Sequence, residues 1–113
     1  MIVGDLNEDC SQHQNLKPLR ELVDAGDLVD PFADLPDHWT HFYEITGETT
    51  RLDYMLVDGA LRSAVCSLSI NRKGVSLKCA SAGERYPTVG HVGTEASDHC
   101  PITIALDLDT LSP

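Results

Sequence analysis

The chain has 113 residues and carries 18 acidic against 8 basic side chains, a net charge of −10. This length suits one domain with one modest core. An acidic surface repels phosphate backbones, which argues against a passive nucleic-acid clamp. No apolar stretch approaches the roughly 20 residues of a membrane-spanning helix, so we predict no membrane span.

The first third of the chain is predicted to hold one short strand and one helix. Residues 1–3 are apolar and lead directly into Gly-Asp-Leu-Asn at 4–7. Residues 15–26 have helical spacing, and Gly26 can end the helix. The apolar face of this helix is formed by Leu16, Leu19, Leu22 and Val23. Residues 27–37, with several Asp and two Pro, predict a loop.

The middle of the chain is predicted to form two strands joined by a turn. Residues 38–43 are rich in aromatic and β-branched side chains, and Gly-Glu-Thr-Thr at 47–50 predicts the turn. Residues 51–57 give the strongest strand pattern in the sequence. Its apolar side chains lie on both faces, which indicates a strand covered by a layer on each side.

The remaining elements are short, apart from one long loop. We expect a helical turn at 59–63 and a strand at 65–70. Residues 71–96 are rich in Gly and Ser without a clear period, and loops of this length are usually functional or mobile. The last predicted strand is 102–108. The sequence therefore predicts an α/β protein with short strands.

The four cysteines predict free thiols, because they form no CxxC pair and are too few for a disulfide scaffold. They are Cys10, Cys66, Cys79 and Cys100. The pairs Cys10 with His13 and His38 with His41 have loose metal-ligand spacing. This leaves open a small zinc-binding protein, although structural zinc sites usually show tighter pairing on both sides.

Three short motifs carry the candidate chemistry: Gly-Asp-Leu-Asn at 4–7, Arg-Leu-Asp-Tyr at 51–54 and Ser-Asp-His at 97–99. In an extended chain, Asp5 and Asn7 project from the same face and could position a water or a phosphoryl oxygen. Asp53 lies among apolar neighbours and needs a partner. An imidazole such as His99 would supply it, and the carboxylate would fix the tautomer and raise the basicity of the ring. Asp98 could hold a metal.

Each motif also has a structural interpretation. Gly-Asp-x-Asn is a common turn sequence. Asp53 could form an ion pair with Arg51 or with a lysine, and His99 could be a core or surface histidine without a catalytic role. Each pattern of three or four residues arises by chance in roughly one chain of this size in a hundred, given average composition. The occurrence of all three in this order is far rarer, and the hypothesis rests on that conjunction.

The three motifs, with Trp39-Thr40 before the second, resemble the last motif blocks of the endonuclease/exonuclease/phosphatase family. This family includes apurinic endonucleases, DNase-type nucleases, sphingomyelinases and inositol-polyphosphate 5-phosphatases. Its fold is a four-layer α/β sandwich, with two central sheets flanked by helices. The resemblance spans residues 1–113, which we expect to be the C-terminal part of such a domain. The expected fold is half of the sandwich, a mixed and mostly antiparallel sheet with flanking helices.

The resemblance implies a metal-dependent phosphoester hydrolase: a nuclease, phosphodiesterase or phosphatase. Asp5 and Asn7 would orient the attacking water and stabilise the transition state. His99, held by Asp53, would contact the scissile phosphate or transfer a proton, so Asn7 and His99 also bind substrate. Asp98 would be a ligand of Mg²⁺ or Mn²⁺, which neutralises developing charge. The implied substrate is a nucleic acid, a phospholipid head group or an inositol phosphate.

The chain departs from the family pattern at its start. The early Asn and the metal-binding Glu of the family's first half are absent. We therefore expect the chain alone to be inactive and to need a missing N-terminal half as its partner. The alternative is a non-catalytic fragment that binds another protein through an uncovered sheet face.

Overall fold

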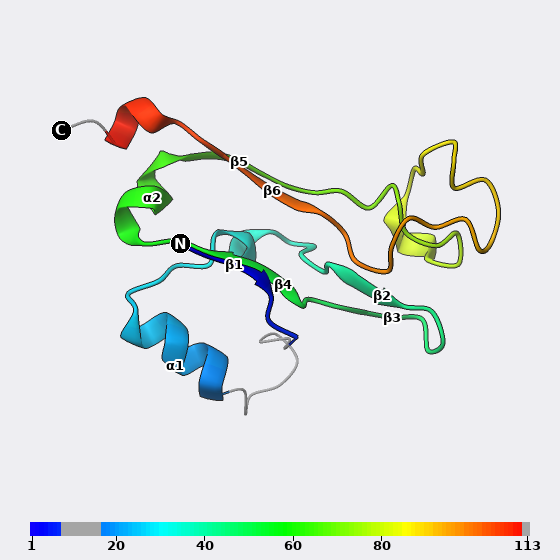
Figure 1. Cartoon of the computed structure of the whole chain (residues 1–113), viewed down its shortest axis with the longest axis horizontal. Coiled ribbons are helices and arrows are strands. Elements are labelled where there is room, and N and C mark those ends of the chain that lie inside the picture. Colours follow the sequence, from blue (N-terminus) through cyan, green and yellow to red (C-terminus); the bar gives the residue numbers. More distant parts are fainter. Residues whose placement is uncertain (8–16, 112–113) are drawn as a thin grey trace.

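The computed structural model describes residues 1–7 and 17–111. In this part of the chain the strands form three two-stranded sheets, all antiparallel. The protein is thus a small mixed α/β protein (Figure 1). The sheets pair β1 (Ile2–Asp5) with β4 (Asp53–Leu56), β2 (His41–Tyr43) with β3 (Glu48–Thr50), and β5 (Val65–Ile70) with β6 (Ile102–Leu106). The helices are α1 (Lys17–Ala25) and α2 (Gly59–Ala64), and three 3₁₀ turns are formed by Pro31–Asp34, Ala80–Ala82 and Leu108–Leu111.

Most predicted elements are present, but the predicted turn at 47–50 was wrong. Residues 44–47 make the turn instead, and the three residues after it pair with β2. Gly47 takes a left-handed conformation (φ 75°), and its N–H donates to the carbonyl of Tyr43. Gly47 thus completes the turn between β2 and β3, and the two β-branched threonines that follow, Thr49 and Thr50, lie in β3. The last strand is also shorter than expected, because the chain turns at Leu108–Leu111.

Helix α1 lies below the β1–β4 sheet in Figure 1. It ends where the N–H of Gly26 donates to the carbonyl of Leu22, as the glycine predicted. Val23 packs against the core, whereas Leu22 is 40% exposed, so the predicted apolar face is only partly covered. The predicted start of the helix, including Leu16, lies outside the described residues. No helix in the described part of the chain is long and apolar enough to cross a membrane.

Two hydrophobic clusters hold the described elements together. Tyr54 and Leu56 of β4 form the first, with Ile2, Leu6, Val23 and Leu28 packed around them. The second joins β2 to the long loop 71–96 and to the chain before β6, and consists of Trp39, Phe42, Val75, Cys79 and Cys100. Apolar burial is the main favourable contribution to folding, so these clusters fix β1–β4 and the segment before β6 as rigid supports.

A buried ion pair holds β4 to the 3₁₀ turn before β2. Both terminal nitrogens of Arg51 donate to the carboxylate of Asp30. The guanidinium lies over the rings of Tyr54 and Phe32, at 4.2 and 5.9 Å from their centroids. The Arg51 side chain is only 5% exposed, so the charge depends on this partner.

We predict that Asp30→Asn destabilises the protein by about 3 kcal/mol, because it leaves a buried guanidinium without its counter-charge. Asparagine keeps the side-chain oxygen that accepts the N–H of Phe32, so the cap is retained. Asp34→Asn in the same 3₁₀ turn is the matched control, because its carboxylate is exposed and 4.0 Å from Arg62. Urea unfolding measures both variants. Equal stability of the two would contradict the assigned role of the pair.

Candidate active site

The register of the β1–β4 sheet places two carboxylates side by side. Asp5 ends β1, Asp53 begins β4, and the two residues are direct partners across the antiparallel pair. Side chains opposite each other in such a pair lie about 5 Å apart at their Cβ atoms. The sheet alone therefore brings the first and second motifs together at one end.

Thr40 links the start of β4 to the third motif. Its buried hydroxyl accepts the backbone N–H groups of Leu52 and Asp53, at 3.0 and 3.1 Å. Its carbonyl accepts the N–H of Cys100 at 2.7 Å. Thr40 thus fixes the backbone of Asp53 relative to that of the residue that follows His99.

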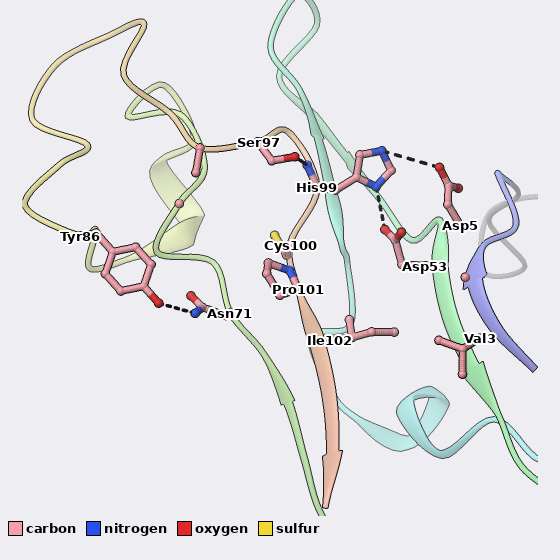
Figure 2. A pocket seen from close by; sticks show the side chains of 13 residues that line it. Val3, Asp5, Asp53, Asn71, Tyr86, Ser97, His99, Cys100, Pro101 and Ile102 are labelled. Carbon is pink, nitrogen blue, oxygen red and sulfur yellow. Dashed lines mark hydrogen bonds and ion pairs between the residues drawn. The ribbon is translucent and has the colours of Figure 1, made fainter. Parts of the chain in front are cut away.

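His99 lies between the two carboxylates (Figure 2). Its Nδ1 is 2.8 Å from Oδ2 of Asp53, and its Nε2 is 3.8 Å from Oδ2 of Asp5. The predicted hydrogen bond between His99 and Asp53 is confirmed. The alternative pairing of Asp53 with Arg51 does not occur, because Arg51 is bound to Asp30. With Nδ1–H donated to Asp53, Nε2 is left facing Asp5.

The charges around His99 favour its protonated form. Partial burial lowers the pKa of His99, but the hydrogen bond to Asp53 and the charges of Asp53, Asp5 and Asp98 together raise this pKa above its ordinary value. An imidazole with a raised pKa can serve as a proton donor or as a cationic contact for an anion near neutral pH.

Asn7 lies beyond the end of β1. Its backbone is left-handed (φ 56°), and its N–H donates to Oδ1 of Asp5 at 2.8 Å. The last bond of the sheet before it runs from the N–H of Leu6 to the carbonyl of Leu52. The expectation based on extended alternation therefore fails for Asn7, because the strand has already ended. Instead, the turn at Asn7 orients the Asp5 carboxylate through the backbone N–H of Asn7.

Asp98 is next to His99 in the chain, but its carboxylate turns toward another histidine. Oδ2 of Asp98 is 3.3 Å from Nε2 of His41, and the Asp98 side chain is 66% exposed. Asp98 lines a separate hollow beside Phe42 and Tyr43, whereas Asp5, Asp53 and His99 line the larger cavity. We predicted that Asp5, Asn7, Asp98 and His99 converge at one sheet edge; of these, Asp5 and His99 meet, whereas Asp98 faces His41 and Asn7 lies beyond the end of β1.

The sequence suggested His41 only as a loose metal-ligand pair with His38, whereas in the structure it lies beside His99. It is joined to His99 by an isolated antiparallel bridge, and the centroids of the two rings are 4.8 Å apart. Two groups of possible metal ligands result: Asp5, Asp53 and His99, and His41, Asp98 and His99, with ligand atoms within 4.8 Å of one another in each group. The sequence held one sign of this role: His41 directly follows Trp39-Thr40, which belongs to the motifs that carry the family resemblance.

The larger cavity has a volume of about 500 Å³ and extends from the carboxylates to the long loop (Figure 2). Its wall is formed by Val3, Gly4, Asp5, Asp53, Asn71, Gly74, Tyr86, Ala96, Ser97, His99, Cys100, Pro101 and Ile102. The side-chain amide of Asn71 donates to the hydroxyl of Tyr86 on the wall opposite His99. The sequence predicted a long loop of the kind that is usually functional or mobile, but it did not identify these two residues.

The cysteines of the described residues are free thiols, as predicted for Cys66, Cys79 and Cys100, and Cys10 lies outside the described residues. Burial raises the pKa of Cys100 to about 11, so this thiol is a poor nucleophile although it lines the cavity. Nδ1 of His38 contacts the carbonyl of Leu35, and His38 belongs to neither ligand group found in the described residues. The proposed pairing of His38 with His41 in one zinc site is therefore not seen.

Comparisons with models of protein families, with curated proteins and with solved structures find no match for this chain. Any inference about its function therefore rests on the geometry of the site and on the three sequence motifs.

We predict that Asp53→Asn lowers the pKa of His99, because the charge-assisted hydrogen bond is replaced by a neutral one. The titration is followed by the imidazole proton signals of His99 in protein treated with a chelator. Asp34→Asn is the control, since its exposed carboxylate lies outside the site. A pKa of His99 that is equal in all three proteins would contradict the dyad.

Proposed function

We propose that this chain carries the substrate-binding and proton-transfer half of a phosphoester hydrolase site. The observation that supports it most is the row Asp53–His99–Asp5, with separations of 2.8 and 3.8 Å along the wall of an open cavity. A carboxylate that orients an imidazole, whose other nitrogen faces a second carboxylate, is an arrangement suited to moving protons at a bound ester. The resemblance of the three motifs to those of phosphoesterases is the reason for proposing a phosphoester as the substrate.

Each residue has a role that follows from its contacts. Asp53 accepts a hydrogen bond from Nδ1 of His99 and, by this bond and its charge, raises the pKa of the imidazole. The Nε2–H of the imidazolium can donate to a phosphoryl oxygen or to the leaving oxygen. Asp5, whose carboxylate is fixed by the N–H of Asn7, can orient the attacking water. The Asn7 side chain, which is at the exposed end of β1, would contact the phosphate.

The carboxylates near His99 are donors that fit a divalent cation such as Mg²⁺ or Mn²⁺. Asp5 offers oxygen ligands, which Mg²⁺ prefers, and Asp98 offers an exposed carboxylate within reach of two imidazoles. When bound, the cation supplies charge neutralisation at the phosphate. The net charge of −10 makes such neutralisation necessary before an anionic substrate can approach.

We propose further that the described sheets belong to a larger α/β sandwich, completed by an N-terminal half. Exposed apolar side chains on β1 support this: Val3 is 55% exposed and lines the cavity opposite Ile102. In the described residues β1 is paired on one edge only, with β4. The same exposed surface favours the second candidate function, a non-catalytic fragment that binds another protein there.

The proposal is tested by binding rather than turnover, because we expect the chain alone to be inactive. A dinucleotide with a phosphorothioate linkage resists hydrolysis and keeps the charge of a phosphodiester. The dinucleotide is added together with Mg²⁺ and without Mn²⁺. It should shift the NMR signals of the His99 imidazole in a saturable way. The His99→Gln variant should bind it at least about 10-fold more weakly, since a charge-assisted hydrogen bond contributes about 1.5–3 kcal/mol.

His91→Gln is the control, because His91 lies on the exposed part of the long loop and outside the cavity wall. Equal affinity of the His99→Gln and His91→Gln variants would contradict a phosphoester site at His99.

A further inference from the structure

His41 and His99 form a pair of imidazoles that are each held from behind by an oxygen. Nδ1 of His99 is bound to Asp53 at 2.8 Å, and Nδ1 of His41 is 3.3 Å from the hydroxyl of Thr50. The Nε2 of His41 then faces Asp98 at 3.3 Å, and the Nε2 of His99 faces Asp5 at 3.8 Å. Metal-binding histidines are characteristically supported in this way, because an oxygen on one nitrogen fixes the tautomer and orients the other toward the ion.

The spacing between His41 and Asp98 fits two ligands of one ion. Their closest atoms, Nε2 and Oδ2, are 3.3 Å apart. Two ligands at about 2.0 Å from a tetrahedral metal lie about 3.3 Å from each other. The ligand atom of His99 completes a group in which all separations are within 4.8 Å.

The burial of the three residues also suits a site that is rigid and accessible. The His41 side chain is 15% exposed and is fixed between β3 and the segment before β6. Asp98 is exposed to solvent, which gives an ion its path of entry. Three carboxylates, those of Asp5, Asp53 and Asp98, lie around the two rings, so a cation is favoured over an anion there.

We propose that His41, Asp98 and His99 form a binding site for a transition-metal ion of the Zn²⁺ or Mn²⁺ class. Two imidazoles and one carboxylate are a donor set for such ions rather than for Mg²⁺, which prefers oxygen ligands alone. Three protein ligands leave one position open for water or substrate, as in catalytic rather than structural zinc sites.

This site rests on the proposed function in one respect, since it names the imidazoles that would hold a cation together with Asp98, but it can be tested without a substrate. An ion at Nε2 of His99 and a proton donated from the same atom exclude each other in one molecule. Metal binding without substrate therefore tests the site, and its failure would leave the phosphoester proposal standing. Failure of phosphodiester binding at His99 would likewise leave the metal site standing.

The test is a titration of the whole chain with Zn²⁺, followed by the imidazole ¹⁵N signals and by calorimetry. Binding should be saturable with one ion, and the Nε2 signals of His41 and His99 should move while their Nδ1 signals stay nearly in place. His41→Ala and Asp98→Asn should each weaken this binding by about 100-fold or more, since even loss of a supporting group costs 10–100-fold. Mg²⁺ at the same concentration should leave the Nε2 signals unchanged.

His91→Ala and His38→Ala are the controls, because neither residue belongs to the ligand group, and both should bind Zn²⁺ as the unchanged chain does. Circular dichroism of each variant checks that the fold is retained. His41 and Asp98 come from different segments, so a shared loss of affinity would not reflect damage to one segment alone. Zn²⁺ that shifts other histidines but not His41 and His99 would overturn the proposal. So would undiminished affinity in folded His41→Ala and Asp98→Asn proteins.

Discussion

The hydroxyl and carbonyl of Thr40 are the contacts on which the arrangement of the site depends. A buried threonine can accept two N–H groups and leave its own backbone free to pair. Here the hydroxyl accepts from Leu52 and Asp53, and the carbonyl accepts from Cys100. The N–H of Thr40 donates to the carbonyl of Thr50, which aligns β2 with β3. One residue therefore positions Asp53, the His99 segment and the strand that carries His41.

This backbone connection explains why a short, acidic chain can hold His99 in one orientation. The imidazole joins the segment before β6 to the β1–β4 sheet, with which the β5–β6 sheet shares no strand. Thr40 fixes the backbone of Asp53 relative to that of Cys100. Without this connection, the 2.8 Å hydrogen bond between His99 and Asp53 alone would have to order the start of β4 and the segment before β6, at a high cost in conformational entropy. The two hydrophobic clusters supply the rest of the rigidity, one below β4 and one around Cys100.

The sequence predicted the parts of the site that follow from local chemistry. Asp53 lies among apolar residues, and such a carboxylate requires a donor, so its bond to His99 could be anticipated. The strand at 65–70 could be read because its bounds are set by α2 and by the loop after it. The pairing of Arg51 with Asp30 could not, because nothing in the sequence links a residue of the loop 27–37 to one before β4.

His41 and Asn7 show why the rest was missed. The position of His41 beside His99 depends on one isolated bridge between distant segments, and the register of such a bridge is not encoded locally. Asn7 follows a strand that ends two residues earlier, and its left-handed backbone redirects the chain. Asparagine tolerates that conformation better than most residues, which is a reason to expect a turn there.

We propose that His99, held by Asp53, faces a bound phosphoester at the end of β1. A crystal structure of the chain with a phosphorothioate dinucleotide tests this placement, because the sulfur gives a distinct anomalous signal and marks the linkage. We expect to find the phosphorothioate within hydrogen-bonding distance of Nε2 of His99, with Nδ1 still bound to Asp53. A dinucleotide bound on another face of the molecule, or a His99 ring turned away from Asp53, would contradict it.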